Sequence, residues 1–449
     1  ITYNLSLSAI DPGQDTITGW EINWGDSNIE QQTGNPGNVQ HIYSNAGNYT
    51  IEATVTDEDG TYTSNTLDIN VIEVPTLRII SNTPTASVFT AELSEQIDAT
   101  AINLYQTENG GESTADLTLI GDTVGLISGT LIIDDDLKGF NFIPTGGPLQ
   151  ADTYTLTVRS GAGAFINIAG QAIDGNSDGT PGGDYVTTFT IGEQAPAAGE
   201  GLFAAAASIT ETPYISFPDI SRGPGQSINI PASATGLPLT LSNGEGITSV
   251  SFTLNYNPAL LTIHGVNAGS DFPVGAGINA DLTTPGIAHI SISSNSAFGT
   301  GAKQLISLDA SVPEDAPYGS KHILDISNLS LNQGQITGIA DDAVHVINYL
   351  GDTTGSGDYT SLDGQYILRL ALGLDSGFAS ALNVDPLLIG DITGNGRISA
   401  LDASRILQQI GSIEQPDIEA LPLIGPIEFA GLDPALSMPT DLKGKIGET

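Results

Sequence analysis

The sequence predicts a mainly β protein of tandem β-sandwich modules, of the immunoglobulin-like and jelly-roll kinds, with a small α-helical module near the C-terminal end. Glycine contributes 54 of the 449 residues and stands among many Thr, Ser, Asn and Asp residues, as in sheets joined by tight turns. Apolar and polar residues alternate along most segments, with turn signals roughly every eight to twelve residues. Two apolar stripes with helical spacing follow residue 360 and predict the helical module.

The charge balance limits the kind of partner. The chain has 52 Asp and Glu residues against 11 Lys and Arg, a formal charge of −41. It lacks the basic groups that neutralise nucleic-acid phosphates, and its charge repels anionic membrane surfaces. With no cysteine and no apolar run of about 18 residues, disulfides and membrane insertion are not expected. The chain begins at Ile1 without an initiator Met, which predicts a processed or partial chain.

The first predicted domain spans residues 1–72 and has the turn spacing of an immunoglobulin-like sandwich. Its residues 20–27 and 41–60 resemble the two signatures of polycystic-kidney-disease (PKD) domains, which implies a noncatalytic spacer or adhesion module. Residues 11–15 align with the turn before the Trp strand, so we expect the domain's first strand to be missing from this chain. The gap would leave an unpaired edge, to which residues 421–429 of a neighbouring chain could add.

The second predicted domain spans residues 73–194 and is similar to bacterial immunoglobulin-like domains of surface-layer and adhesin proteins. Near its end, oxygen side chains at alternate positions precede Gly179, as in the first half of a calcium loop. The candidate Ca²⁺ ligands are Asp174, Asn176, Asp178 and, closing the site, Asp184. The alternative is a polar turn without metal, because no helix follows and the twelfth position offers no ligand.

Residues 195–212 are rich in Ala, Pro and Gly and predict a linker to a third domain at residues 213–347. Residues 223–231 and 247–261 resemble motifs of cohesin modules, which implies a nine-stranded jelly-roll with a docking or carbohydrate-binding role. Alternation in the second motif predicts a strand with one face in the core. Its apolar positions are Val250, Phe252, Leu254 and Tyr256.

Two twelve-residue loops near the C-terminal end have the pattern that wraps a backbone around Ca²⁺. Oxygen side chains stand at positions 1, 3, 5, 9 and 12, and position 6 is Gly, because the chain turns there with φ > 0. The predicted ligands of the first loop are Asp352, Thr354, Ser356, Asp358 through its main chain, Thr360 and Asp363. Those of the second are Asp391, Thr393, Asn395, Arg397 through its main chain, Ser399 and Asp402.

With its two loop-helix units, the segment 351–412 resembles type I dockerins, whose duplicated units bind Ca²⁺ and dock onto cohesin modules. Positions 3 and 5 depart from the family's usual Asn or Asp, so each loop has two clear carboxylates and we expect a Kd on the order of 10⁻⁴ M. Positions 10 and 11 carry recognition in the family. Here they are Ser361 and Leu362 in one unit, and Ala400 and Leu401 in the other. Alternatively, the two leucines bury against the chain's own cohesin-like module.

The tail at residues 413–449 has little periodicity, which leaves a linker, a packing strap or a strand offered to a neighbour.

No pattern in the sequence predicts catalysis. The histidines are scattered and match no metal or nucleophile motif. They are His41, His264, His289, His322 and His345, of which His41 belongs to the PKD signature and is expected to be packed. The acidic runs at residues 134–136 and 341–342 are predicted to be solvated surface, since neighbouring Asp side chains point to different sides.

Together these features predict a noncatalytic, calcium-stabilised scaffold protein, secreted by a bacterium to the cell exterior or surface. It would assemble through cohesin-like and dockerin-like contacts, with copies of itself or with other such modules, as a filament or surface-fibre subunit. The alternative is a carbohydrate-binding accessory region of a larger polysaccharide-degrading or adhesin protein. That hypothesis requires a row of exposed aromatic side chains on which sugar rings stack, and the low aromatic content of 6% disfavours it.

Overall fold

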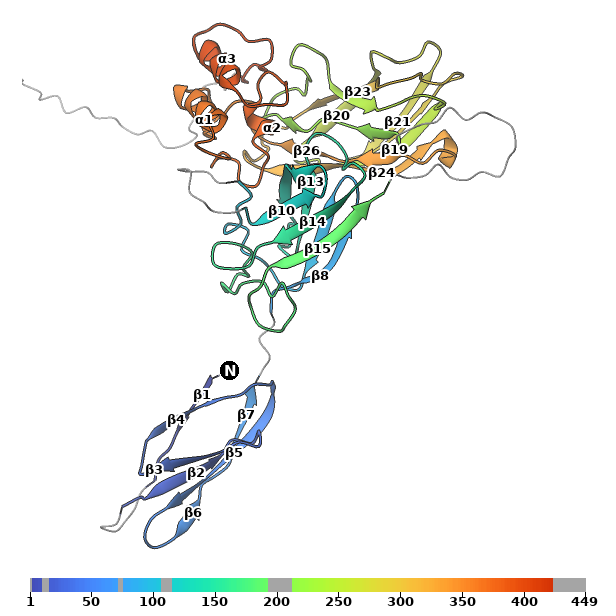
Figure 1. The fold of residues 1–449 in the computed structure, drawn as a ribbon. Helices are drawn as coiled ribbons and strands as arrows, with labels where there is room; N and C mark the ends of the chain where they lie inside the picture. The colour runs from blue at the N-terminus through green and yellow to red at the C-terminus, as the bar shows by residue number, and fades with distance from the viewer. Residues whose placement is uncertain (1, 10–15, 72–75, 106–114, 193–211, 423–449) are drawn as a thin grey trace, which may run out of the picture. The chain divides into compact units, whose positions relative to one another are not determined.

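The computed structural model describes residues 2–9, 16–71, 76–105, 115–192 and 212–422 (Figure 1). The chain divides into two compact units, Ile1–Thr76 and Leu77–Thr449. The predicted mainly β architecture is confirmed, and the described residues include three helices between positions 361 and 410. Most of the predicted linker, residues 195–211, and most of the segment 421–429 lie outside the described residues.

The first unit is a small antiparallel sandwich. Strand β1 (Thr2–Ser6) pairs with β4 (Asn38–Ile42). The second sheet is built on β5 (Gly47–Thr56), which pairs with β2 (Gly19–Asn23), β6 (Thr61–Thr63) and β7 (Leu67–Val71), while β3 (Ile29–Thr33) pairs with β2. Residues 11–15 lie outside the described residues, and the missing first strand stays a prediction.

The signature residues of this unit form its core. The indole ring of Trp24 is fully buried and stacks on the His41 imidazole, with 4.6 Å between ring centroids. The Tyr43 hydroxyl donates to the Trp24 carbonyl oxygen at 2.8 Å. His41 Nε2 lies 2.8 Å from a carboxylate oxygen of Asp26. The prediction that His41 is a packed residue is therefore confirmed.

The second unit begins with a sandwich of two four-stranded antiparallel sheets, which we call the Ig-like module (residues 77–192). One sheet has the order β11-β10-β14-β15 and the other β12-β13-β9-β8. The strands are β8 (Ile79–Pro84), β9 (Phe89–Leu93), β10 (Leu117–Gly121), β11 (Gly125–Ile127), β12 (Gly129–Ile133), β13 (Gly139–Pro144), β14 (Asp152–Val158) and β15 (Tyr185–Ile191). Aromatic side chains fill the space between the sheets, among them Phe89, Phe140 and Tyr154.

Residues 212–347 form a larger sandwich. Its five-stranded sheet has the order β20-β23-β18-β16-β25, and its six-stranded sheet the order β17-β26-β24-β19-β22-β21. The strands are β16 (Tyr214–Ser216), β17 (Ile220–Ser221), β18 (Leu237–Leu241), β19 (Ser249–Asn255), β20 (Thr262–Ala268), β21 (Gly277–Thr284), β22 (Ile287–Ser293), β23 (Lys303–Ser311), β24 (Lys321–Leu331), β25 (Ile339–Asp341) and β26 (Ala343–Val346), with a short 3-10 turn (Asn332–Gly334) before β25.

The first and last segments of this sandwich cross between its sheets, since β16 pairs in parallel with β25 in one sheet and β17 with β26 in the other. If β16 and β17 are counted as one strand, and β25 and β26 as another, the eleven strands become the nine that the sequence resemblance implies. The predicted alternation on β19 is confirmed, because Val250, Phe252 and Leu254 are buried in the core.

The C-terminal segment carries α1 (Ser361–Ala371), α2 (Leu387–Gly390) and α3 (Ala400–Ile410). Helices α1 and α3 lie side by side (Figure 1). Their buried residues Ile367 and Ile406 belong to one apolar cluster with Val344 and Val346 of β26. The helical segment is thus not a separate globule, because it completes its core on the outer side of the neighbouring sandwich.

Residues 415–422 fold back from α3 onto the same sandwich. The Gln226 side-chain amide donates to the Ala420 carbonyl oxygen at 3.2 Å, and Ile418 is buried. This part of the tail is therefore a packing strap, while residues 423–449 lie outside the described residues.

The Ig-like module is also joined to its neighbours. Asn383, in the connection between α1 and α2, accepts the Leu104 N–H on its side chain at 2.9 Å and the Leu131 N–H on its carbonyl at 2.8 Å. The Asp342 N–H donates to the Ser87 hydroxyl at 2.6 Å. Backbone bonds of this kind fix the three parts of the second unit against one another.

Candidate functional site

The two C-terminal loops have nearly the same backbone. Gly357 and Gly396, at position 6 of each loop, both have φ of 77°. Gly355 and Gly394, at position 4, have φ of 70° and 66°. The left-handed turn predicted at position 6 is therefore present in both loops.

Each loop wraps around its first carboxylate. Asp352 accepts the N–H of Ser356 on Oδ1 at 3.1 Å and that of Gly357 on Oδ2 at 2.7 Å. Asp391 accepts the corresponding N–H groups of Asn395 and Gly396 at 3.2 and 2.6 Å. Bonds to successive main-chain donors hold both carboxylates toward the loop centre.

The closing carboxylates are buried and serve the helices as well. Asp363 accepts the Thr354 N–H on Oδ1 at 2.9 Å and the Thr360 N–H on Oδ2 at 2.7 Å. Asp402 accepts the corresponding N–H groups, of Thr393 at 3.0 Å and of Ser399 at 2.8 Å. Because each Asp stands at the third position of its helix, the same bonds form a capping box that starts α1 or α3.

The remaining predicted ligands supply neutral oxygens. The hydroxyl of Thr354 donates to Asp352 Oδ1 at 3.0 Å, and the Ser356 hydroxyl donates to the Asp358 carbonyl oxygen at 3.0 Å. No three His, Cys, Asp or Glu side chains converge as a metal cluster within the described part of the chain. The donor set of each loop is thus two carboxylates with hydroxyl and carbonyl oxygens, to which Asn395 adds an amide oxygen in the second loop. Such a set suits a hard cation such as Ca²⁺.

The loop in the Ig-like module begins in the same way. Asp174 is buried and accepts the N–H of Asp178 on Oδ1 at 3.1 Å and that of Gly179 on Oδ2 at 3.0 Å. Ser177 and Gly179 have φ of 58° and 88°, as at positions 4 and 6 of the other loops. The difference lies at the end of the loop, because Asp184 accepts the N–H of Ser160 at 2.8 Å and strand β15 follows instead of a helix.

The predicted interface residues occupy equivalent positions on the two helices. Leu362 is 42% exposed and Leu401 is 51% exposed, and Ser361 and Ala400 beside them are exposed as well. The alternative prediction, that the two leucines bury against the chain's own cohesin-like module, is therefore wrong. That contact is made instead by the buried isoleucines on other sides of the helices.

The prediction that residues 341–342 are solvated surface is also wrong. Asp341 is 5% exposed and lies beside Ser87 of the Ig-like module, with Asp219 and Asp342 as charged neighbours. Burial, reinforced by those two carboxyls, raises the pKa of Asp341 to about 8. Burial likewise raises the pKa of Asp219 to about 7. Sequence neighbours gave no signal for this cluster, because it forms only where two modules meet.

Two of the histidines lie next to each other in the structure. His322 on β24 and His345 on β26 are buried neighbours, with 2.9 Å between His322 Nε2 and His345 Nδ1. His322 Nδ1 accepts the Asn257 N–H at 3.1 Å, so its Nε2 carries the proton and donates to His345. Burial lowers the pKa of His322 to about 4, in keeping with a neutral structural pair.

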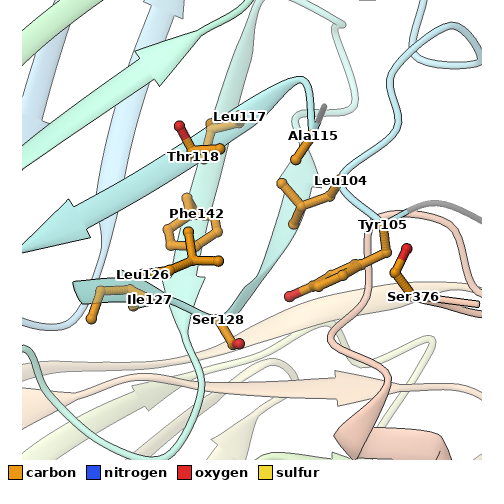
Figure 2. A pocket seen from close by; sticks show the side chains of 10 residues that line it. All are labelled: Leu104, Tyr105, Ala115, Leu117, Thr118, Leu126, Ile127, Ser128, Phe142 and Ser376. Atoms are coloured by element: carbon orange, nitrogen blue, oxygen red, sulfur yellow. The ribbon is translucent and has the colours of Figure 1, made fainter. Parts of the chain in front are cut away.

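A cavity of about 370 Å³ lies between the Ig-like module and the connection after α1 (Figure 2). Its wall is mostly apolar and includes Leu104, Leu117 and Phe142, with Ser376 across from them. The Tyr105 hydroxyl at its rim donates to the Gly129 carbonyl oxygen at 2.6 Å. Among the described residues, the cavity therefore offers few polar groups with which to orient a ligand.

Within the described residues, no helix is both long enough and apolar enough to cross a membrane.

Comparison with protein families gives two matches. A model of the PKD domain matches residues 1–71, and a model of the cohesin domain matches residues 215–346. No curated protein matches the chain.

Several solved cohesin structures are similar to part of this chain. A non-cellulosomal cohesin from the archaeon Archaeoglobus fulgidus has 14% identity and a TM-score of 0.25, covering 30% of this chain and 89% of its own. The third cohesin ScaC of Acetivibrio cellulolyticus, in complex with the ScaB dockerin, has 15% identity and a TM-score of 0.26, covering 30% and 99%. The seventh ScaB type I cohesin of Pseudobacteroides cellulosolvens has 13% identity and a TM-score of 0.25, covering 30% and 91%.

Both matched domains are noncatalytic interaction modules, of kinds typical of extracellular or surface proteins. The chain therefore contains a PKD domain at residues 1–71 and a cohesin domain at residues 215–346.

Proposed function

We propose that this protein is a calcium-stabilised extracellular scaffold subunit, and that its C-terminal helical segment docks onto the cohesin domain of another copy. The observation that carries the proposal is the exposure of Leu362 and Leu401 at equivalent positions of two helices that are otherwise packed against the chain's own cohesin domain.

Calcium binding is supported by the shared geometry of the loops. Asp352 and Asp391 are held toward the loop centres by main-chain donors, and Asp363 and Asp402 close the loops from the helices. A cation between two such carboxylates relieves their repulsion and replaces hydrogen bonds among the side chains. The Asp174 loop is a third candidate, and it has weaker support because its twelfth position offers no ligand side chain.

Assembly between copies is supported by the part of the cohesin domain's six-stranded sheet that the chain's own helical segment does not cover. The helical segment packs on β26, at one side of the six-stranded sheet. Farther along that sheet, His289 on β22 and Asp281 on β21 are exposed. The exposed leucines and this polar face belong to different regions of the molecule, so a contact between them joins two chains.

Such a contact is heterologous, because one copy supplies the helices and the next supplies the sheet. Repetition of a heterologous contact makes a ring when the rotation closes and a filament when it does not. We propose the open form, a filament or surface fibre.

Sedimentation velocity on the full chain tests both parts of the proposal. In millimolar Ca²⁺ we expect concentration-dependent assembly, which chelation reverses. The double substitution Leu362→Asp with Leu401→Asp is expected to leave monomers, since it places two charges on the contact. Leu372→Asp is the matched control, because Leu372 is 73% exposed at the end of α1 and away from positions 10 and 11. Monomers of the parent at every concentration, or unaltered assembly of the double variant, would contradict docking.

The described residues do not favour carbohydrate binding, because they lack an exposed row of aromatic side chains on which sugar rings could stack. Tyr62 is the one aromatic residue among the strongly exposed apolar side chains of the described residues, and both Trp side chains are buried.

A further inference from the structure

The cohesin domain reaches into the first candidate calcium loop through one side chain. Tyr318 lies in the turn between β23 and β24, and its hydroxyl donates to Asp352 Oδ2. Asp352 is the first residue of that loop and is fully buried. The bond therefore connects a candidate cation ligand to a residue 34 positions away in a different domain.

The second loop has no counterpart of this bond among the described contacts. The donors to Asp391 are Asn395, Gly396 and Thr393, all within its own loop. Asp352 has the corresponding three donors and Tyr318 in addition. The two loops are thus matched in backbone and in local donors, and differ in this one contact from outside.

Tyr318 is itself held firmly by the end of the cohesin domain and by the segment that joins it to the first loop. Its hydroxyl accepts the Tyr349 N–H at 3.1 Å, and its ring lies 5.5 Å from the Tyr349 ring. The next residue, Gly319, donates its N–H to the Ile347 carbonyl oxygen at 2.8 Å. A side chain fixed at both its ring and its backbone cannot follow Asp352 if the loop opens.

The same hydroxyl also orders the chain that leads into the loop. It lies 2.7 Å from Asn348 Oδ1, and the Asn348 carbonyl oxygen accepts the Ser221 hydroxyl at 2.8 Å. Asn348 is fully buried, so this entrance to the first loop is packed against the cohesin domain. The chain segment that enters the first loop is therefore rigidly held.

We propose that Tyr318 is a positioning residue for Ca²⁺ in the first loop, and that it couples the affinity of this loop to the folded cohesin domain. The inference rests on the calcium binding proposed above. A hydrogen bond to a ligating carboxylate fixes the orientation of that carboxylate. Loss of such a partner typically lowers metal affinity by about 10- to 100-fold. By reciprocity, Ca²⁺ in the first loop stabilises the cohesin domain, whereas Ca²⁺ in the second loop does so less.

Calorimetric Ca²⁺ titration of the full chain tests the inference. Asp352→Ala and Asp391→Ala assign the binding steps, since each is expected to remove one. Tyr318→Phe, which loses only the hydroxyl, is expected to weaken the Asp352 step about 10-fold and to leave the Asp391 step unchanged. Tyr349→Phe is the matched control, because its hydroxyl donates to the Pro224 carbonyl oxygen at 3.1 Å and not to Asp352.

The outcomes separate the inference from the function on which it rests. If neither Asp→Ala variant removes a step, calcium binding itself is wrong. If each removes one step while Tyr318→Phe binds like the parent, or weakens both steps equally, the positioning role alone is wrong. Thermal melting gives a second measurement: Ca²⁺ is expected to raise the melting temperature of the cohesin domain more in Asp391→Ala than in Asp352→Ala. Equal rises would overturn the coupling.

Discussion

The buried carboxyl of Asp341 contributes stability to the second unit that is lost as the pH rises. The native carboxyl keeps its proton to about pH 8, whereas an unfolded Asp releases it near pH 3.8. Between these values the native state binds more protons, so the free energy of unfolding falls with rising pH. The difference corresponds to at most about 6 kcal/mol for one group, and Asp219 and Asp342 act in the same direction.

Substitution Asp341→Asn isolates this effect, because an amide keeps the shape of the carboxylic acid and cannot ionise. Urea unfolding of the parent and the variant from pH 5 to pH 9 measures it. We expect an advantage of about 1–2 kcal/mol for the variant at pH 5, which grows to several kcal/mol at pH 9. Asp135→Asn is the matched control, since Asp135 is exposed, and its profile is expected to follow the parent. Parallel profiles of Asp341→Asn and the parent would refute the reasoning.

Two further substitutions test the packing of each unit. Gly351→Ala places a Cβ 2.2 Å from Ile406 Cδ1 at a backbone φ of 96°, so we expect a loss of about 2–4 kcal/mol in thermal melting of the helical segment. Gly394→Ala, also at positive φ but with open space around its Cβ, is expected to cost only about 1 kcal/mol, and equal losses would contradict the steric account. Trp24→Ala removes a fully buried ring and is expected to destabilise the first unit by about 3–5 kcal/mol. Calorimetry should then show the transition of the second unit unchanged, and a shift in both transitions would contradict two independently folding units.

Local patterns in the sequence predicted much of the fold. Alternation along β19 identified its buried face, because the direction of a strand side chain depends on its position alone. Gly357 and Gly396 predicted left-handed turns, because glycine adopts positive φ without a steric penalty. The PKD and cohesin motifs identified two domains that the family comparisons confirm.

Short-range patterns were enough to predict the course of the loops and the oxygen-bearing residues along them, since these follow from neighbours within about twelve positions. Which surfaces are covered could be seen only in the folded chain. It buried Asp341 under the Ig-like module, left Leu362 and Leu401 exposed, and placed Tyr318 on Asp352. Burial and long-range hydrogen bonds depend on contacts between segments far apart in the chain, and such contacts leave no mark on local residue patterns.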